Sequence, residues 1–353
     1  MKNYIKHTVA VLLLIVFVIS SYLPVVAVGQ PSSYSDVSNS GQRHVVCTSL
    51  DGTGAEDYYT GNYTYDSLSS MSSSLLLSSL RTLMADTHTV RSTYDDCKVM
   101  ATKTDCENNN GKITMIYTSY SGSYSQYNGG NGWNREHVWP KSRGGFETTG
   151  PGADLHHIRP SENLTNSNRG NRLYGNVSGG TTSKGNLSGL VGGEYTSSYY
   201  EPLDNVKGDV ARICLYLYVR YGASYPKCSS ITNVFQSVDV LLEWCALDPV
   251  DTWEMGRNEV VEAYQGNRNV FIDYPELAWT LFGRTAPSDM TTPSGEAAGG
   301  NVGNGGGNTG SGGSTDISGF DSVIAVVETD AEKILILLAL GVSDSLVLDG
   351  ISN

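Results

Sequence analysis

Two short runs that each lead directly into a proline constrain the fold of this chain most strongly. Arg135–Trp139 alternates polar and apolar residues, and Asp154–Arg159 has a similar length. Proline lacks a backbone N–H and seldom continues a strand, so each run predicts a short β-strand. Ser161 then favours a helix start and Gly170 favours its end after two turns. The sequence therefore predicts a strand, a loop, a second strand and a helix within forty residues.

This unit lies in a stretch whose charge differs from that of the whole chain. The chain has 353 residues and a net charge of -13, whereas Trp133–Tyr174 holds six Lys/Arg against four Asp/Glu and three of the six histidines. From Thr285 onward there are nine acidic residues and one basic residue, which account for -8 of the total. A locally basic window in an acidic chain can still bind a polyanion, but the salt-dependent attraction is weaker than for a chain that is basic overall.

The residue types in this window suit hydrolysis of a phosphodiester. A neutral histidine is a natural base, a hard divalent ion on oxygen ligands offsets developing charge, and arginine binds phosphate. Side chains alternate along a strand, so Glu136 and His137 can serve one site only if the strand bends or ends there. We expect His137 to face the scissile phosphate, Glu136 to reach a metal, and Asn166 to supply a ligand from the facing helix.

The runs WNREHVWPKS, DLHHIRP and NSNRGNRLYG resemble the secreted bacterial endonuclease I family, within the ββα-metal (His-Me finger) nucleases. Matching runs continue as KGDVARICLYLYVRYG, LLEWCALDPVDTWEMGRN and QGNRNVFIDYPEL, so the resemblance covers Tyr58–Leu281. It implies that His137 is the general base and that Glu136 and Asn166 hold one Mg²⁺, or another hard divalent cation such as Ca²⁺ or Mn²⁺. It also implies an arginine on the phosphate, and Arg143 is the nearest match in a loop of variable length.

Other polar residues of the window have less definite roles. Arg169 and Asn171 are expected to support the helix and the substrate groove, and His156 is placed with them among the substrate-binding candidates. His156 and His157 should face opposite sides of a strand, with one near the metal or its water and the other structural. Asp154 is expected to be a hydrogen-bond anchor rather than a metal ligand.

The chain ends predict an exported protein with a flexible C-terminal extension. Lys2 and Lys6 precede an apolar run over Val9–Ile19, which indicates a signal peptide ending near Ala27. The alternative is an uncleaved anchor, which the shortness of the run disfavours. The expected organisation is a signal peptide (1–27), an exposed leader (28–45), a catalytic domain (46–284), a Gly/Ser/Asn-rich linker (285–315) and a tail without an assigned role (316–353).

The predicted fold class is α+β: a mixed, mostly helical domain around a small ββα-metal finger. Helices are predicted over Ser67–Met84, Lys207–Tyr221, Val234–Cys245, Asp251–Gln265 and Pro275–Phe282, a strand over Lys112–Thr118, and a hairpin within Gly175–Ser198. The even count of six cysteines in an exported chain favours disulfides, with Cys97–Cys106 the preferred pair among fifteen connectivities. No CxxC pair occurs, which disfavours a thiolate zinc site.

The resulting prediction is a secreted, monomeric, metal-dependent endonuclease without sequence preference, and without a membrane span after signal cleavage. The family implies DNA, and often RNA, as substrate and 5′-phosphate products. The alternative is a secreted nucleic-acid-binding or adhesion protein with a degenerate nuclease fold, which the intact set of Glu136, His137 and Asn166 disfavours. A metallopeptidase is disfavoured because the sequence has no HExxH helix.

Overall fold

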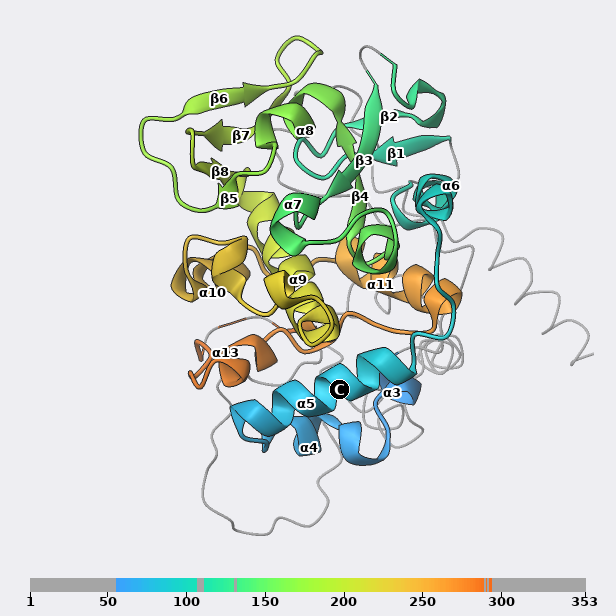
Figure 1. The fold of residues 1–353 in the computed structure, drawn as a ribbon, viewed down its shortest axis with the longest axis vertical. Coiled ribbons are helices and arrows are strands. Elements are labelled where there is room, and N and C mark those ends of the chain that lie inside the picture. The colour runs from blue at the N-terminus through green and yellow to red at the C-terminus, as the bar shows by residue number, and fades with distance from the viewer. Residues whose placement is uncertain (1–54, 107–110, 130–131, 289, 291, 294–353) are drawn as a thin grey trace, which may run out of the picture. The chain divides into compact units, whose positions relative to one another are not determined.

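The computed structural model describes residues 55–106, 111–129, 132–288, 290 and 292–293 (Figure 1). The predicted signal peptide, leader and C-terminal tail, and most of the linker, lie outside these residues and stay predictions. The helices are α3 (Ala55–Tyr58), α4 (Tyr65–Ser69), α5 (Ser73–Asp86), α6 (Tyr94–Thr104), α7 (Lys141–Gly144), α8 (Asn163–Arg169), α9 (Asp204–Tyr221), α10 (Val238–Leu247), α11 (Thr252–Gln265), α12 (Val270–Asp273) and α13 (Leu277–Leu281). The strands are β1 (Lys112–Thr114), β2 (Ser121–Ser123), β3 (Trp133–His137), β4 (Ile158–Glu162), β5 (Leu173–Tyr174), β6 (Thr181–Lys184), β7 (Val191–Tyr195) and β8 (Tyr199–Glu201).

Helix α9 is the centre of the helical part of the domain. It packs against α5, α10 and α12, and Figure 1 shows it between the sheets on one side and α5 and α13 on the other. Most of its residues are buried on every face, including Val210, Cys214 and Leu217. A helix that is buried around its circumference lies in the core, so α9 is the support against which the smaller elements pack.

The strands of the described residues form three small sheets, and one of them supplies the strand pair of the predicted ββα unit. β3 and β4 pair antiparallel from Trp133↔Glu162 to His137↔Ile158, and α8 follows β4 directly. The first strand ends at His137, two residues earlier than predicted, and the second begins four residues later because 154–157 forms a turn. The prediction that proline stops the second strand is wrong, since Pro160 pairs with Arg135 inside β4. The Pro160 carbonyl accepts the Ile116 N–H at 2.9 Å, but among the described residues no further strand pairs with β4 and requires the N–H that proline lacks.

The caps of α8 show which local signals were correct. The side chain of Glu162, and not that of Ser161, caps the helix by accepting the Thr165 N–H at 2.8 Å. Gly170 ends the helix as predicted, with a φ of 55° that suits glycine. The short helix is thus fixed at both ends, and this fixes where its Asn166 and Arg169 side chains lie.

The remaining elements largely follow the sequence pattern, and the α+β class is confirmed. The helix predicted over Ser67–Met84 is two helices, α4 and α5, separated at 70–72. The predicted strand over Lys112–Thr118 ends at Thr114. The other four helix predictions are confirmed with shifts of a few residues, as is the hairpin, which is formed by β6 and β7.

The predicted disulfide between Cys97 and Cys106 is not formed. All five cysteines among the described residues are buried free thiols. Cys97 lies in a cluster with Leu155 and Trp253 and donates to the Ala153 carbonyl at 3.1 Å, whereas Cys106 lies beyond the end of α6 in a bridge with Ile113. Burial raises the pKa of Cys97 to about 12, so its thiol is protonated at neutral pH. None of the described helices is long and apolar enough to cross a bilayer.

Candidate active site

His137 is the last residue of β3, and a backbone carbonyl fixes its ring. Its Nε2 lies 3.1 Å from the carbonyl oxygen of Gly152, in the turn η3 (Gly150–Ala153). A carbonyl oxygen only accepts, so Nε2 carries the proton and Nδ1 keeps its lone pair. Burial, and then the nearby His157, lower the pKa of His137 to about 3. The imidazole is therefore neutral at neutral pH and can take up a proton at Nδ1.

Glu136 points into the protein beside Arg169 of α8. Its Oε1 accepts the Tyr117 hydroxyl at 2.5 Å and lies 3.4 Å from Arg169 Nε. Burial raises the pKa of Glu136 to about 7, against the opposing influence of Arg169 and Tyr117. Adjacent residues of one strand thus provide a neutral base and a buried carboxyl group, and an added cation would favour the ionised form of that carboxyl.

Asn166 lies one turn before the end of α8, which packs against both β3 and β4. Its Nδ2 donates to Asn134 Oδ1, and this orients the amide so that its oxygen is the atom available to a cation. Nowhere among the described residues do three or more His, Cys, Asp or Glu side chains gather as a metal site. One carboxylate and one amide oxygen, completed by water and substrate oxygens, is the arrangement that Mg²⁺ tolerates. Glu136 on β3 and Asn166 on α8 each carry one oxygen donor of this kind.

The predicted substrate-binding residues divide into surface and interior positions. Arg143, on α7, donates from Nε to the Asn171 carbonyl, so the structure brings these two residues together. A terminal guanidinium nitrogen of Arg143 also donates to the Asn233 carbonyl at 3.4 Å. Arg169 is fully buried and donates to the Val138 carbonyl as well as contacting Glu136. Contact with substrate is thus open to Arg143 and Asn171, while Arg169 acts from below the surface.

His156 and His157 point in opposite directions from the turn that precedes β4. His156 Nε2 lies 2.9 Å from the Asn267 carbonyl, and the ring packs against Tyr216 with centroids 4.7 Å apart. His157 donates from Nδ1 to the Pro151 carbonyl at 2.6 Å and accepts the Trp139 N–H at 2.9 Å. Burial lowers the pKa of both rings to about 4. It is therefore His157, and not His156, that lies on the His137 side, with ring centroids 5.6 Å apart.

Three residues that contact the site have no recognisable signal in the sequence. Gly152 contributes only a backbone carbonyl, and Tyr117 comes from a segment 19 residues before Glu136. Tyr94, at the start of α6, stacks on His137 with ring centroids 5.4 Å apart, and the Arg135 guanidinium lies 3.5 Å above the Tyr94 ring. A helical or strand period cannot reveal such contacts, because they join elements that are distant in sequence.

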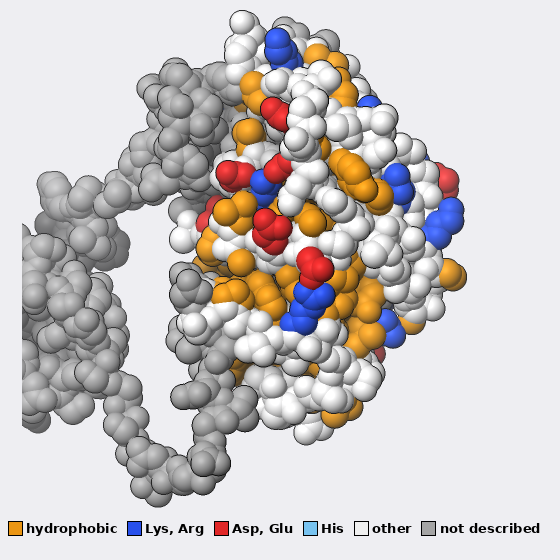
Figure 2. All heavy atoms as spheres, turned by 90° about the vertical axis from the view of Figure 1, so that its left-hand side faces the viewer, with side chains coloured by type: hydrophobic (Ala, Val, Ile, Leu, Met, Phe, Trp, Pro, Cys, Tyr) orange, Lys and Arg blue, Asp and Glu red, His pale blue; other side chains and the backbone are white. Residues whose placement is uncertain are grey.

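The charge of the surface matters for a polyanion ligand. On the face drawn in Figure 2, Lys and Arg side chains are spread singly among Asp and Glu side chains and do not form one continuous basic patch. On that face, then, no broad positive field is available to steer a polyanion.

Comparisons with known proteins show the family of the chain. The sequence model of the Endonuclease I family matches residues 73–276, more than half of the chain, and this range contains every predicted site residue. The chain belongs to the endonuclease I family. An extracellular ribonuclease of Bacillus subtilis (strain 168) is 44% identical over 183 residues, which cover 48% of this chain and 61% of that protein.

Two further relatives are similar to parts of the chain. An extracellular ribonuclease of Bacillus amyloliquefaciens is 43% identical over 182 residues, again 48% of this chain and 61% of the relative. Endonuclease-1 of Buchnera aphidicola subsp. Acyrthosiphon pisum (strain APS) is 23% identical over 120 residues, 34% of this chain and 44% of the relative. The chain thus spans about 61% of the length of the two more similar relatives.

Proposed function

We propose that this protein is a secreted, metal-dependent endonuclease that hydrolyses phosphodiester bonds of DNA and RNA without sequence preference. The observation that carries the proposal is the fixed ring of His137, whose Nε2 lies 3.1 Å from the Gly152 carbonyl. This leaves Nδ1 as a proton acceptor, on the residue that follows the buried Glu136 in β3. Family membership supports the reaction, and the names of the extracellular ribonucleases support both export and RNA as a substrate.

In the proposed reaction His137 removes a proton from the attacking water through Nδ1. The Nε2–H bond to the Gly152 carbonyl then stabilises the imidazolium as it forms. Arg143 binds a phosphate oxygen from the surface of α7. Glu136 and Asn166 would hold a Mg²⁺, Mn²⁺ or Ca²⁺ ion, which when bound offsets the charge that develops on the phosphate and the leaving oxygen. The products carry 5′-phosphates.

Arg169 is a positioning residue in this scheme and does not contact substrate. It is fully buried, lies 3.4 Å from Glu136 Oε1 and donates to the Tyr174 hydroxyl at 3.2 Å. A fixed guanidinium at this distance favours the ionised carboxyl group. Arg169 therefore keeps Glu136 oriented and ready to bind a cation. The predicted substrate roles of Asn171 and His156 stay predictions, and the ring of His156 is only 2% exposed.

A digestion assay tests the proposal. Supercoiled plasmid, single-stranded DNA and RNA are incubated with the protein, with EDTA, and with Mg²⁺, Mn²⁺ or Ca²⁺ restored. We expect cleavage of all three substrates, loss with EDTA and recovery with metal. His137→Ala should lower the rate by a factor on the order of 10³ or more, with an unchanged circular dichroism spectrum. Near-wild-type cutting by this variant, or binding without turnover by the wild type, contradicts the proposal.

A matched pair of variants on α8 tests the metal site. Asn166→Ala should raise the metal concentration required for activity. Asn168→Ala serves as the control, because Asn168 is an amide of the same helix that donates to the Lys184 carbonyl at 3.1 Å. Equal metal requirements in the two variants would remove Asn166 from the site.

A further inference from the structure

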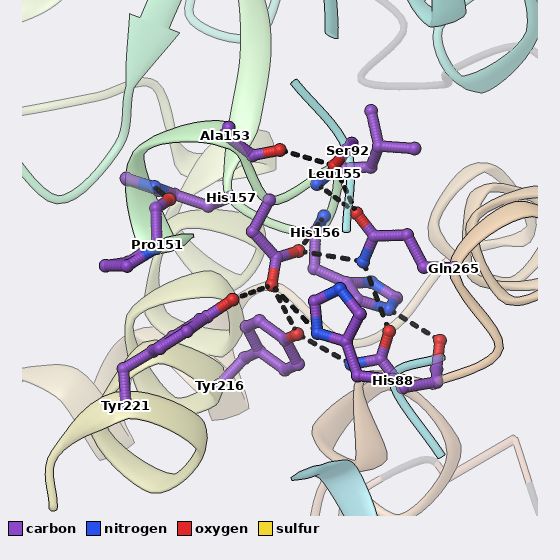
Figure 3. A network of polar contacts seen from close by, with 12 residues as sticks. His88, Ser92, Pro151, Ala153, Leu155, His156, His157, Tyr216, Tyr221 and Gln265 are labelled. Carbon is purple, nitrogen blue, oxygen red and sulfur yellow. Dashed lines mark hydrogen bonds and ion pairs between the residues drawn. The ribbon is translucent and has the colours of Figure 1, made fainter. Parts of the chain in front are cut away.

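A buried carboxylate behind the turn η3 has no part in the chemistry described above. Asp154 is 1% exposed and each of its oxygens receives two donors. Oδ2 accepts the hydroxyls of Tyr216 and Tyr221, both at 2.7 Å, and Oδ1 accepts the His156 N–H at 2.8 Å and the Gln265 amide at 3.1 Å. Figure 3 shows the tyrosines reaching this network from α9 and Gln265 reaching it from the opposite side.

The network holds the carboxylate as a charged group in the interior. Burial by itself raises the pKa of Asp154, yet the His88 and His156 rings and the tyrosine donors outweigh burial and lower it. The His88 ring lies beside the same oxygen as the tyrosines, with Nδ1 3.8 Å from Oδ2. Hydrogen bonds to a charged acceptor are shorter and stronger than neutral ones. Asp154 therefore ties the end of η3 firmly to the central helix α9.

The turn that Asp154 anchors is the one that orients the base. Three successive carbonyls of η3 accept hydrogen bonds from side chains: that of Pro151 from His157, that of Gly152 from His137, and that of Ala153 from Ser92 at 2.5 Å and from Cys97. The Asp154 carbonyl accepts the backbone N–H groups of 157 and 158 at 3.0 and 2.9 Å. The position of the Gly152 oxygen thus depends on an anchor only two residues away.

We propose that Asp154, held by Tyr216 and Tyr221, is a positioning residue for the hydrolysis: by fixing η3 it keeps the Gly152 carbonyl where it selects the Nε2–H tautomer of His137. The inference rests on the proposed function, but its geometric part concerns the ring of His137 alone. If η3 shifts, the ring loses its acceptor and the tautomer that leaves Nδ1 unprotonated is no longer selected. Fewer molecules then carry a competent base, so kcat falls while substrate binding is retained.

Matched tyrosine variants separate positioning from general stabilisation. Tyr221→Phe removes one hydroxyl from Asp154 and keeps the ring. Tyr59→Phe is the control, because the Tyr59 hydroxyl donates at the same 2.7 Å to another buried carboxylate, that of Asp273. Both variants lose a charge-assisted hydrogen bond, but only the first touches the anchor of η3. Asp154→Asn is the stronger perturbation, and Tyr221→Phe keeps the test valid if that variant fails to fold.

Two measurements decide the proposal. The first is kcat and KM on a short oligonucleotide at saturating Mg²⁺, and the second is the ¹⁵N spectrum of the His137 imidazole, which distinguishes the two tautomers without turnover. We expect Tyr221→Phe to lower kcat about tenfold, which corresponds to the loss of about one charge-assisted hydrogen bond. KM should stay within about twofold of the wild type, and the spectrum should show a mixture of both His137 tautomers. Tyr59→Phe should keep the wild-type kcat and a single tautomer.

Several outcomes would overturn the inference. Equal values of kcat in the two tyrosine variants would mean that Asp154 only stabilises the fold. An unchanged His137 spectrum in Tyr221→Phe would mean the same. If the wild type cuts no nucleic acid, the proposed function fails. The spectrum then still tests whether Asp154 sets the tautomer, so the two failures are distinguishable.

Discussion

Replacing His156 by glutamine should flatten the dependence of stability on pH. The His156 ring is 2% exposed and its Nε2 lies 2.9 Å from the Asn267 carbonyl. Burial lowers the pKa of His156 to about 4, whereas a histidine in an unfolded chain has a pKa of about 6.5. Glutamine keeps an N–H group for the carbonyl but binds no proton in this range.

The magnitude follows from proton linkage. As the pH falls from about 6.5 to about 4, the unfolded chain binds a proton at residue 156 and the folded protein does not. The folded-state pKa is the lower one, so the free energy of unfolding decreases throughout this window on acidification. The slope for one proton is about 1.4 kcal/mol per pH unit. Between pH 6 and 4.5, His156→Gln should therefore lose about 2 kcal/mol less stability than the wild type.

Urea unfolding followed by tryptophan fluorescence at pH values from 4.5 to 6.5 measures this difference. The test compares the free energies of unfolding of wild type and variant because Glu136 also changes stability with pH. Its pKa is raised to about 7, so its contribution to stability increases on acidification, opposite to that of His156. Glu136 holds a proton in the folded state that the unfolded chain releases, and its contribution cancels between wild type and variant. Parallel stability curves over the whole range would refute the reasoning, because residue 156 would then bind the same number of protons folded and unfolded.

Three further outcomes are expected. Gly152→Ala should destabilise the protein by about 2 kcal/mol in chemical unfolding and should also lower kcat in the digestion assay. The reason is that a Cβ at this position would lie 1.7 Å from the Glu147 carbonyl oxygen. Arg212→Met should cost about 3–5 kcal/mol in the same unfolding assay, since it leaves the buried Glu254 carboxyl without its 2.5 Å partner, and adding Glu254→Gln should recover part of the loss. Tyr94→Leu should lower the thermal midpoint modestly, because it removes the ring that lies 3.5 Å from the Arg135 guanidinium.

Local signals in the sequence predicted the helices well because the groups that begin and end them are neighbours. Asp251 caps α11 by accepting the Glu254 N–H at 2.9 Å, and Gly170 ends α8 in the left-handed region. The strand containing Pro160 was harder to place, since the cost of proline depends on whether a further strand pairs on that edge. The disulfide prediction failed because Cys97 packs in the cluster with Leu155 and Trp253, whereas Cys106 forms a backbone bridge with Ile113.

The site shows the same division between local and distant information. The short motifs named Glu136, His137 and Asn166, and β3 and α8 place them on neighbouring elements. The groups that hold these side chains in place could not be predicted, because they come from segments distant in sequence. They are the Gly152 carbonyl, the Tyr117 hydroxyl and the buried Arg169. A sequence pattern identifies which side chains are present, whereas burial decides which of them reach the surface.

Glu136 and His137 are adjacent on β3 but rest on separate supports. The carboxyl group of Glu136 is held by Tyr117 and by Arg169 of α8, while the ring of His137 is held by η3 and, through it, by Asp154 and α9. Because successive side chains of a strand leave on opposite faces, a change in one support need not reach the other. A variant of Arg169 should then change the metal requirement and leave the tautomer of His137 intact, and a variant of Asp154 should do the reverse. Their combined effect on activity should be close to the product of the single effects, as for independent sites, and strong coupling would mean that the strand transmits strain between them.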